Sequence, residues 1–487
     1  MRQLSLELLE LIAENTSSTR DIAQLALVNH QCHAAAIRAL FHTMAIHSPQ
    51  QYAALVRHTK RFKEQGWLNY VRRVDLSSYT ARGSGWSEAQ AKAIVEPEGL
   101  AYLLSSCVNM TQLYVGEEMM QAFVEPVVIR AVFNGHLRLE VLDFTGFCDR
   151  KFTAAMAEVF AEDKDKKNNE EEMSTMEQQP PAATTTTAVP TVMPPRLGNI
   201  SFYMCMALSQ ASFFVPFFKQ MRSNGNALHR LDLGHTKVTS DLFQHLNPDS
   251  MTHLNLQGCH GIRCCSAVIP FLSRARAHLV ELNLNMNFNG VASNNFCREC
   301  LSHLVATEMP SLRSLNLGGH ASMDDTVLAS FSTVNLKKIE YLSLASSQHI
   351  TTDGLMTLLG KMPNLKYLNL SRTWFALDLK YMVAILQNIV GSSPVSLCGG
   401  EGIQQQQPQQ KLYKALKVVE ISQSTTGSSS NKNRLPEQFQ GWSLVHHGRR
   451  SYYSRDNVDP RFFYANKLPL RDEFPCSPMT KYWSYSC

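Results

Sequence analysis

Apolar residues recur along this chain of 487 residues in a spacing that fits short strands. Each copy has one apolar residue followed by two more at the third and fifth positions after it, so that the last two share one face of an extended segment. Six clear copies stand in tandem: Leu228/Leu231/Leu233, Met251/Leu254/Leu256, Leu279/Leu282/Leu284, Leu312/Leu315/Leu317, Ile339/Leu342/Leu344 and Leu365/Leu368/Leu370. Their starts are separated by 23, 28, 33, 27 and 26 residues. The spacing predicts a regular array in which each copy supplies one short strand.

Weaker copies of the same pattern flank these six, at Val71/Val74/Leu76, Met110/Leu113/Val115, Leu139/Leu142/Phe144, Leu197/Ile200/Phe202 and Leu416/Val419/Ile421. The residues after a strand carry helical spacing, as in Leu355, Leu358 and Leu359. One strand and one helix cannot bury their apolar faces alone, whereas stacked copies can, with parallel strands on a concave face and helices outside. The separations between successive copies bracket the period of leucine-rich repeats. We therefore expect an α/β fold, a leucine-rich-repeat solenoid with a curved parallel sheet and outer helices.

The segments after the strands support this interpretation. Cys259 and Asn287 follow their strands at the place where a repeat side chain turns inward and hydrogen-bonds backbone. The stretch 347–355, Ser-Gln-His-Ile-Thr-Thr-Asp-Gly-Leu, resembles the cysteine-containing subclass of leucine-rich repeats, with Ser347 in place of cysteine. That subclass is typical of F-box proteins.

Residues 4–46 have the pattern of a compact helical module. Its apolar positions at helical spacing are Leu4, Leu8, Leu9, Leu11 and Ile12, followed by Ile22, Leu25, Val28 and Cys32. Ser18 and Asp21 resemble a capping box at the start of the second helix, and residues 34–41 predict a third. Three short helices bury little surface by themselves, so we expect this module to dock onto a neighbour.

The module resembles a fungal-style F-box. The resemblance is carried by its opening at 4–12, its middle at 21–28 and its end at 40–46. The chain departs from the family pattern at Ser5, where proline is usual, and at Cys32, where many members have tryptophan. An F-box followed by leucine-rich repeats is itself a known family arrangement.

The resemblance implies a substrate-recognition subunit of an SCF-type (Skp–cullin–F-box) ubiquitin-protein ligase. Such proteins bind the Skp adaptor, and through it the cullin, while their repeats hold a target protein for ubiquitination and proteasomal degradation. The resemblance implies side chains that contribute apolar surface partly to the adaptor and partly to the module's own core. These adaptor-binding candidates are Leu4, Leu8, Leu9, Ile12, Leu25 and Val28. The chain would act by positioning and would not be an enzyme. The alternative is a ligase-independent protein-interaction scaffold whose first 46 residues only cap the array.

Target contacts are expected from the strand positions between the core leucines, which face the concave side. In the main array these substrate-binding candidates are Asp232, His253, Asn255, Glu281, Asn283, Asn316, Tyr341, Tyr367 and Asn369. Asp75, Tyr114, Asp143 and Arg230 hold equivalent positions. The row suits hydrogen bonding to a polar or basic peptide. Alternatively, several of the asparagines form a ladder with one another along the sheet.

Composition divides the chain into segments. The predicted ones are the F-box at 1–46, N-terminal repeats at 67–161, a disordered insertion at 162–195, the main repeat array at 196–422 with a Gly/Gln-rich insertion at 396–411, a linker at 423–439, and an aromatic-rich C-terminal cap or tail at 440–487. Residues 442–453 predict a hairpin that turns at Gly448. The last segment covers the final repeat, or it packs into the concave face or offers aromatic anchors to a partner.

Charge and motifs argue against several function classes. The net charge of +5 is small and the basic residues are dispersed, which gives no case for nucleic acid or membrane partners. No apolar run of about 18 residues and no leader-like start occur, so we expect a cytoplasmic and/or nuclear protein with reduced thiols. A nucleophile elbow, a phosphate-binding loop and a dinucleotide fingerprint are all missing, so we expect no catalytic residues and no cofactor.

The 12 cysteines invite a metal interpretation at two places. The candidates are Cys297, Cys300 and His303 on a predicted helix, and Cys259, His260, Cys264 and Cys265 upstream of it. A tetrahedral zinc site needs four converging ligands, and the sequence shows no fourth partner for the first group. We therefore expect no metal, with the cysteines acting as small core residues.

Overall fold

The computed structural model describes residues 4–16, 18–160, 192–286, 293–373, 385, 389, 415–421, 438–439, 442–447, 450–455 and 470. The chain forms two compact units, unit 1 (Met1–Ala227) and unit 2 (Leu228–Cys487). The predicted insertions at 162–195 and 396–411, the linker at 423–439 and the segment 440–487 lie wholly or largely outside the described residues. No helix in the described ranges is long and apolar enough to cross a bilayer.

Unit 1 begins with three short helices, α1 (Leu6–Asn15), α2 (Thr19–Leu25) and α3 (His30–His42). The Ser18 hydroxyl accepts the backbone N–H of Asp21, which confirms the predicted start of α2. The expectation that helical spacing continues from Ser18 to Cys32 is wrong. Asn29 accepts the N–H of Cys32 at 2.8 Å and begins α3, so the third helix starts before residue 34 and Val28 lies in the turn between helices.

A parallel sheet follows in unit 1, with strands β1 (Thr43–Ala45), β2 (Arg73–Leu76), β3 (Gln112–Val115), β4 (Val141–Phe144) and β5 (Asn199–Ser201). Met44, Val74, Leu113, Leu142 and Ile200 lie side by side in register, and all are buried. The four upstream copies of the apolar pattern are therefore confirmed as strands. Strand β1, at the end of the helical module, was not among the predicted strands.

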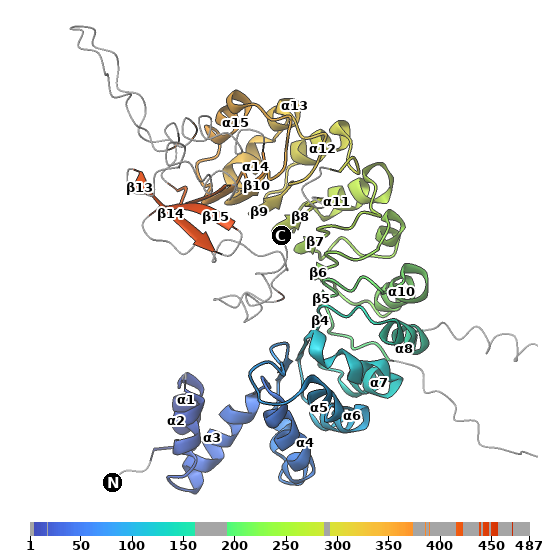
Figure 1. The fold of residues 1–487 in the computed structure, drawn as a ribbon, viewed down its shortest axis with the longest axis vertical. Helices are drawn as coiled ribbons and strands as arrows, with labels where there is room; N and C mark the ends of the chain where they lie inside the picture. The colour runs from blue at the N-terminus through green and yellow to red at the C-terminus, as the bar shows by residue number, and fades with distance from the viewer. Residues whose placement is uncertain are drawn as a thin grey trace, which may run out of the picture. The chain divides into compact units, whose positions relative to one another are not determined.

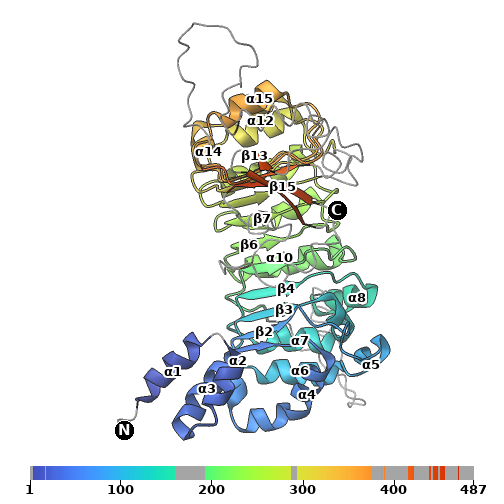
Figure 2. The same ribbon diagram turned by 60° about the vertical axis from the view of Figure 1, so that its left-hand side comes forward.

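Helical segments connect these strands, and Figure 2 shows α6 and α7 beside β2, β3 and β4. The connecting segments of unit 1 are α4 (Pro49–Glu64), η1 (Trp67–Tyr70), α5 (Glu88–Ala93), α6 (Pro97–Ser106), η2 (Glu117–Val124), α7 (Pro126–Gly135), α8 (Arg150–Phe160), η3 (Gln210–Phe214) and α10 (Val215–Ser223). Aromatic contacts join the helical module to the repeats. The ring centroid of Phe41 on α3 lies 5.2 Å from that of Phe62 and 5.4 Å from that of Trp67. With β1 in the sheet, these contacts make the module continuous with the first repeats.

Unit 2 repeats the arrangement with strands β6 (Arg230–Asp232), β7 (His253–Asn255), β8 (Glu281–Asn283), β9 (Ser314–Asn316), β10 (Tyr341–Ser343), β11 (Tyr367–Asn369) and β12 (Val418–Ile421). Its connecting segments are η4 (Ser240–Gln244), η5 (Cys264–Val268), α11 (Ile269–Ala275), α12 (Arg298–Ala306), α13 (Asp325–Ala329), α14 (Thr333–Lys338) and α15 (Thr352–Leu359). The central residues of the strands, from Leu231 to Val419, pair in register and are fully or almost fully buried. In Figure 1 the strands of unit 2 lie on the inner side of a curve and the helices on the outer side. The predicted concave strand face is thus confirmed for this unit.

The chain leaves most strands through the same turn. The second residue after the last apolar strand position has a positive φ in seven repeats, at Gly146, Met204, His235, Gly258, Gly319, Ser346 and Arg372. The next residue points inward. Cys259 Sγ donates to the Leu233 carbonyl at 3.0 Å, and Cys205 Sγ donates to the Phe144 carbonyl at 2.7 Å. The predicted inward role of Cys259 is confirmed, whereas Asn287 lies outside the described residues.

An antiparallel hairpin ends the sheet of unit 2. Strand β15 (Arg450–Arg455) pairs with β12, strand β14 (Trp442–His447) pairs with β15, and β13 (Gln438–Phe439) pairs with β14. The predicted hairpin is confirmed, with His447 opposite Arg450 across a two-residue connection. Tyr453 and Trp442 are buried, so the hairpin covers the last repeat.

His320 holds the inward position in its repeat and is completely buried. Its Nε2 lies 2.8 Å from the Leu284 carbonyl oxygen, and because a carbonyl only accepts, this nitrogen carries the proton. Its Nδ1 has no hydrogen-bond partner among the described residues. Burial therefore lowers the pKa of His320 to about 4.

The low pKa of His320 predicts loss of stability in acid. An unfolded histidine binds a proton near its ordinary pKa of 6.5, whereas the folded side chain resists protonation until about pH 4. The contribution of neutral His320 to the free energy of unfolding is therefore present above pH 6.5 and is lost as the pH drops toward 4. The loss is about 2 kcal/mol between roughly pH 7.5 and pH 5. We expect His320→Asn, which keeps one N–H donor and does not titrate, to remove this part of the pH dependence. Urea unfolding of both proteins at the two pH values measures it, and an equal loss in the variant contradicts it.

Candidate protein-binding surfaces

The three N-terminal helices have a filled core and an apolar outer face. Small and medium side chains from the helices form the core, in two groups: Leu9, Cys32 and Ala35, and Ala13, Ile22 and Ala36. Of the side chains implied for adaptor binding, Leu9 is buried in this core and Leu25 is half-buried against both groups. These two residues hold the helices together.

The other four implied side chains are exposed. Leu4, Leu8 and Ile12 are 49%, 49% and 47% exposed, and Val28 is 66% exposed. Leu8 and Ile12 are one turn apart on α1, and Leu4 precedes the helix. Leu11 and Leu27 are also exposed and were missed as surface residues by the sequence pattern. The two core groups form without these six, so their side chains are available for contact outside the bundle. We call them the helix face: Leu4, Leu8, Leu11, Ile12, Leu27 and Val28.

Ser5 fits the place where the F-box pattern has proline. It precedes α1 with φ −68° and ψ 158°, and its side chain makes no capping hydrogen bond. A proline ring fixes φ near this value, so Ser5 adopts the backbone geometry that proline would impose.

All nine predicted substrate-binding side chains lie on the concave strand face of unit 2. Each strand offers its first and third residues there, and lateral pairing aligns them in two rows. The first-position row is Arg230, His253, Glu281, Ser314, Tyr341, Tyr367 and Val418, and the third-position row is Asp232, Asn255, Asn283, Asn316, Ser343, Asn369 and Glu420.

The third-position row has a local structural role. The side-chain oxygen of Asn255 accepts the backbone N–H of Gln257 at 3.0 Å, two residues along the chain. The same bond forms at Asp232, Asn283, Asn316 and Asn369, with distances of 2.9, 3.1, 3.0 and 2.9 Å. Such Asx turns satisfy backbone as the chain leaves a strand. These five side chains therefore stabilise the turns at the strand ends. This role differs from both alternatives expected from the sequence, which were target binding and an asparagine ladder.

The first-position row carries the more distinctive chemistry. Glu281, Ser314 and Tyr341 are adjacent across β8, β9 and β10, and all three are partly accessible. Burial raises the pKa of Glu281 to about 7, with Arg230 acting against the shift and Asp232 adding to it. Burial also raises the pKa of the Tyr341 hydroxyl. The three residues form a polar patch with one carboxyl group that gains or loses a proton near neutral pH; we call it the β8–β10 patch.

Tyr367 belongs to a buried junction with the terminal hairpin. Its hydroxyl donates to the Glu420 carboxylate, which also accepts from Arg450 at 3.4 Å. Burial and the Glu420 charge raise the pKa of Tyr367 well above its ordinary value, which keeps the hydroxyl protonated as a donor. Tyr452 packs on Tyr367 and Val418. Glu420 and Arg450 were absent from the predicted site. Glu420 lies on this face as the third residue of β12, whereas Arg450 reaches it only through the hairpin.

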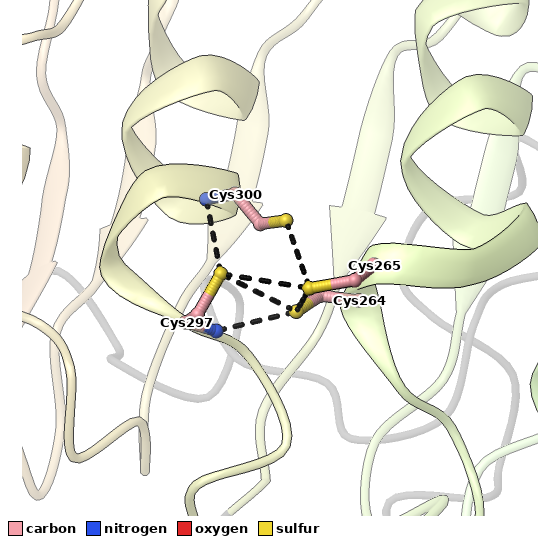
Figure 3. A group of neighbouring side chains, drawn as sticks. All are labelled: Cys264, Cys265, Cys297 and Cys300. Atoms are coloured by element: carbon pink, nitrogen blue, oxygen red, sulfur yellow. Dashed lines mark hydrogen bonds between the residues drawn. The ribbon is translucent and has the colours of Figure 1, made fainter.

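Four cysteines of unit 2 gather between η5 and α12, as Figure 3 shows. Cys264 and Cys265 lie at the start of η5, Cys297 caps α12, and Cys300 lies in its first turn. The expectation that Cys297 and Cys300 lack further partners is wrong, because stacking of successive repeats places Cys264 and Cys265 beside them. The three remaining sequence candidates, Cys259, His260 and His303, do not belong to this group of four.

No protein-family model and no curated protein sequence matches the chain. Among solved structures, a chain of the Rad7 and Elc1 complex from yeast aligns with 75% of this chain and 88% of its own length, at 12% identity and a TM-score of 0.39. The leucine-rich-repeat protein LegL7 from Legionella pneumophila gives 72% and 98% coverage, 15% identity and a TM-score of 0.32. The leucine-rich-repeat protein LIC12759 of Leptospira interrogans gives 64% and 69% coverage, 11% identity and a TM-score of 0.28. Similarity at this level carries no information on function.

The repeat geometry itself defines the class of fold. In both units, parallel three- or four-residue strands align their apolar centres, helical segments connect them, and unit 2 shows the concave strand face and outer helices. The chain is a leucine-rich-repeat solenoid preceded by a three-helix module.

Proposed function

We propose that this chain is a receptor subunit of an SCF-type ubiquitin ligase, in which the helix face binds a Skp-type adaptor and the concave face of unit 2 binds a target protein. The observation that carries the adaptor half is the helix face. Six large apolar side chains remain accessible on a bundle that has already filled its own core. Several large exposed apolar side chains on one small module indicate a protein interface.

The position of the module supports a receptor role. Strand β1 follows α3 directly and pairs with β2, and Phe41 packs on Phe62 and Trp67. A rigid junction holds a bound adaptor at a fixed place relative to the first repeats of unit 1. A receptor accelerates transfer by raising the effective concentration of a target lysine, so rigid attachment favours the function without any reacting group in the chain.

The target half of the proposal rests on the β8–β10 patch. Glu281, Ser314 and Tyr341 offer a carboxyl group and two hydroxyl groups on adjacent strands of the concave face. Rigid aromatic and hydrogen-bonding side chains on a fixed sheet are suited to protein recognition. A basic or hydroxyl-rich segment matches this chemistry.

The test is affinity purification of the full chain with the proteasome inhibited. We expect a Skp-type adaptor and cullin in the purified complex, and no adaptor binding would reject the ligase role. We also expect the double variant Glu281→Ala, Tyr341→Ala to keep the adaptor while losing captured targets by about tenfold or more. The matched control changes two accessible side chains away from the concave face, Glu308→Ala with Tyr102→Ala. Equal target loss in both variants would contradict the assignment to the patch.

A further inference from the structure

The four-cysteine group on unit 2 has the dimensions of a metal site. The Sγ–Sγ distances are 3.3 Å from Cys264 to Cys265, 3.8 Å from Cys264 to Cys297, 3.7 Å from Cys265 to Cys297 and 3.6 Å from Cys265 to Cys300. All four sulfur atoms lie within 4.8 Å of one another. Four thiolates bound to one zinc ion at ~2.3 Å form a tetrahedron with edges of ~3.8 Å. The observed separations fit these edges, and they exceed the ~2.05 Å of a disulfide bond.

The local backbone explains how two adjacent cysteines face the same point. Successive residues of a regular helix or strand point in different directions. At Cys264 and Cys265 the segment is irregular, since Ser266 inside η5 has φ −98° and ψ −125°. Both sulfurs therefore turn toward α12, as Figure 3 shows. On the other side, Cys297 and Cys300 have the Cys-x-x-Cys spacing that places two ligands at the start of a helix.

Hydrogen bonds hold the two halves together and favour thiolates. The Cys264 sulfur accepts the backbone N–H of Cys297 at 3.2 Å, and the Cys297 sulfur accepts the N–H of Cys300 at 3.4 Å. Donors aimed at a ligand atom orient it and stabilise its charge. Asn295 ties the same turns to each other, because its side chain donates to the His260 carbonyl and accepts from Arg263, both at 2.9 Å.

From this geometry we propose that Cys264, Cys265, Cys297 and Cys300 bind one zinc ion that joins two successive repeats of unit 2. Four protein ligands leave no open position for substrate, so the site is structural and not catalytic. Sulfur ligands in a tetrahedron select zinc or iron, and a multinuclear iron–sulfur cluster would spread its cysteines over several metal atoms, wider than this group allows. Cys265 is exposed, which gives the ion an entry path. This inference is independent of the proposed ligase role.

The test begins with elemental analysis of the purified full chain. We expect about one zinc per chain, and less than about a tenth of that in Cys265→Ser and in Cys297→Ser. The matched control is Cys148→Ser, which removes an exposed cysteine of unit 1 and should retain the metal. A cobalt-substituted wild-type protein should show the strong visible absorption of a tetrahedral thiolate site.

A second measurement does not depend on the folding of variants. A thiol-specific mercurial added to the wild-type protein should release zinc to a coloured indicator, with mass spectrometry locating the modified residues at these four cysteines. Three results would overturn the proposal: neither zinc retention nor cobalt uptake, a disulfide between any two of the four in unreduced protein, or iron in place of zinc.

Discussion

Replacing Leu8 and Ile12 together by aspartate should weaken binding of the full chain to a Skp-type adaptor by about 100-fold or more. Both side chains are about half exposed on α1, outside the two core groups of the bundle. Two carboxylates would be desolvated against an apolar partner, while the two core groups of the bundle keep all their members. Binding of purified proteins, measured by calorimetry, gives the affinity.

The control must carry the same change of charge on another apolar surface of unit 1. Val108→Asp with Leu137→Asp does so, because both side chains are exposed and lie outside the helical module. We expect this control to bind the adaptor like the wild type. Wild-type affinity in the Leu8/Ile12 variant would refute the assignment of the helix face. Leu9→Asp is not informative here, since Leu9 is buried and its replacement would disrupt the helices.

Leu142→Ala should reduce the free energy of unfolding by about 3 kcal/mol. Leu142 is fully buried at the centre of β4, where it lies in register between Leu113 and Ile200. Its truncation removes contacts to both neighbouring repeats, and stacked repeats depend on such nearest-neighbour packing. Urea unfolding followed by circular dichroism measures the change.

The matched control is Leu137→Ala, the same substitution at a side chain that is 61% exposed. We expect this control to change the unfolding free energy by less than about 0.5 kcal/mol. Equal effects at the two positions would mean that alignment of the strand centres does not stabilise unit 1.

The strands could be predicted because the apolar spacing reports burial directly. Leu231, Leu254 and Leu282 recur at positions whose side chains can only share a core if the strands stack in parallel. The same logic placed nine side chains on the concave face. Their roles could not be predicted, because an Asx turn depends on a backbone N–H two residues away, and spacing alone does not distinguish such an asparagine from one that binds a partner.

Contacts between repeats were harder to predict than the repeats themselves. Cys265 and Cys300 are far apart in sequence, and their convergence depends on where each helix starts after its strand and on the irregular turn at Ser266. The helix face was only partly predicted for a related reason. The apolar positions of α1 run around much of the helix, and the sequence does not say which of them, such as Leu9 or Leu11, packs inward.

The antiparallel hairpin at β14 and β15 has a consequence for how this molecule can change length. A parallel array grows when a duplicated repeat pairs with its terminal strand, but β15 already occupies that side of β12 in the opposite direction. A duplication after Ile421 would have to displace Tyr452 and break the bond from Arg450 to Glu420. Evolution can therefore lengthen unit 2 far more readily by inserting repeats between existing ones than by adding them at this boundary.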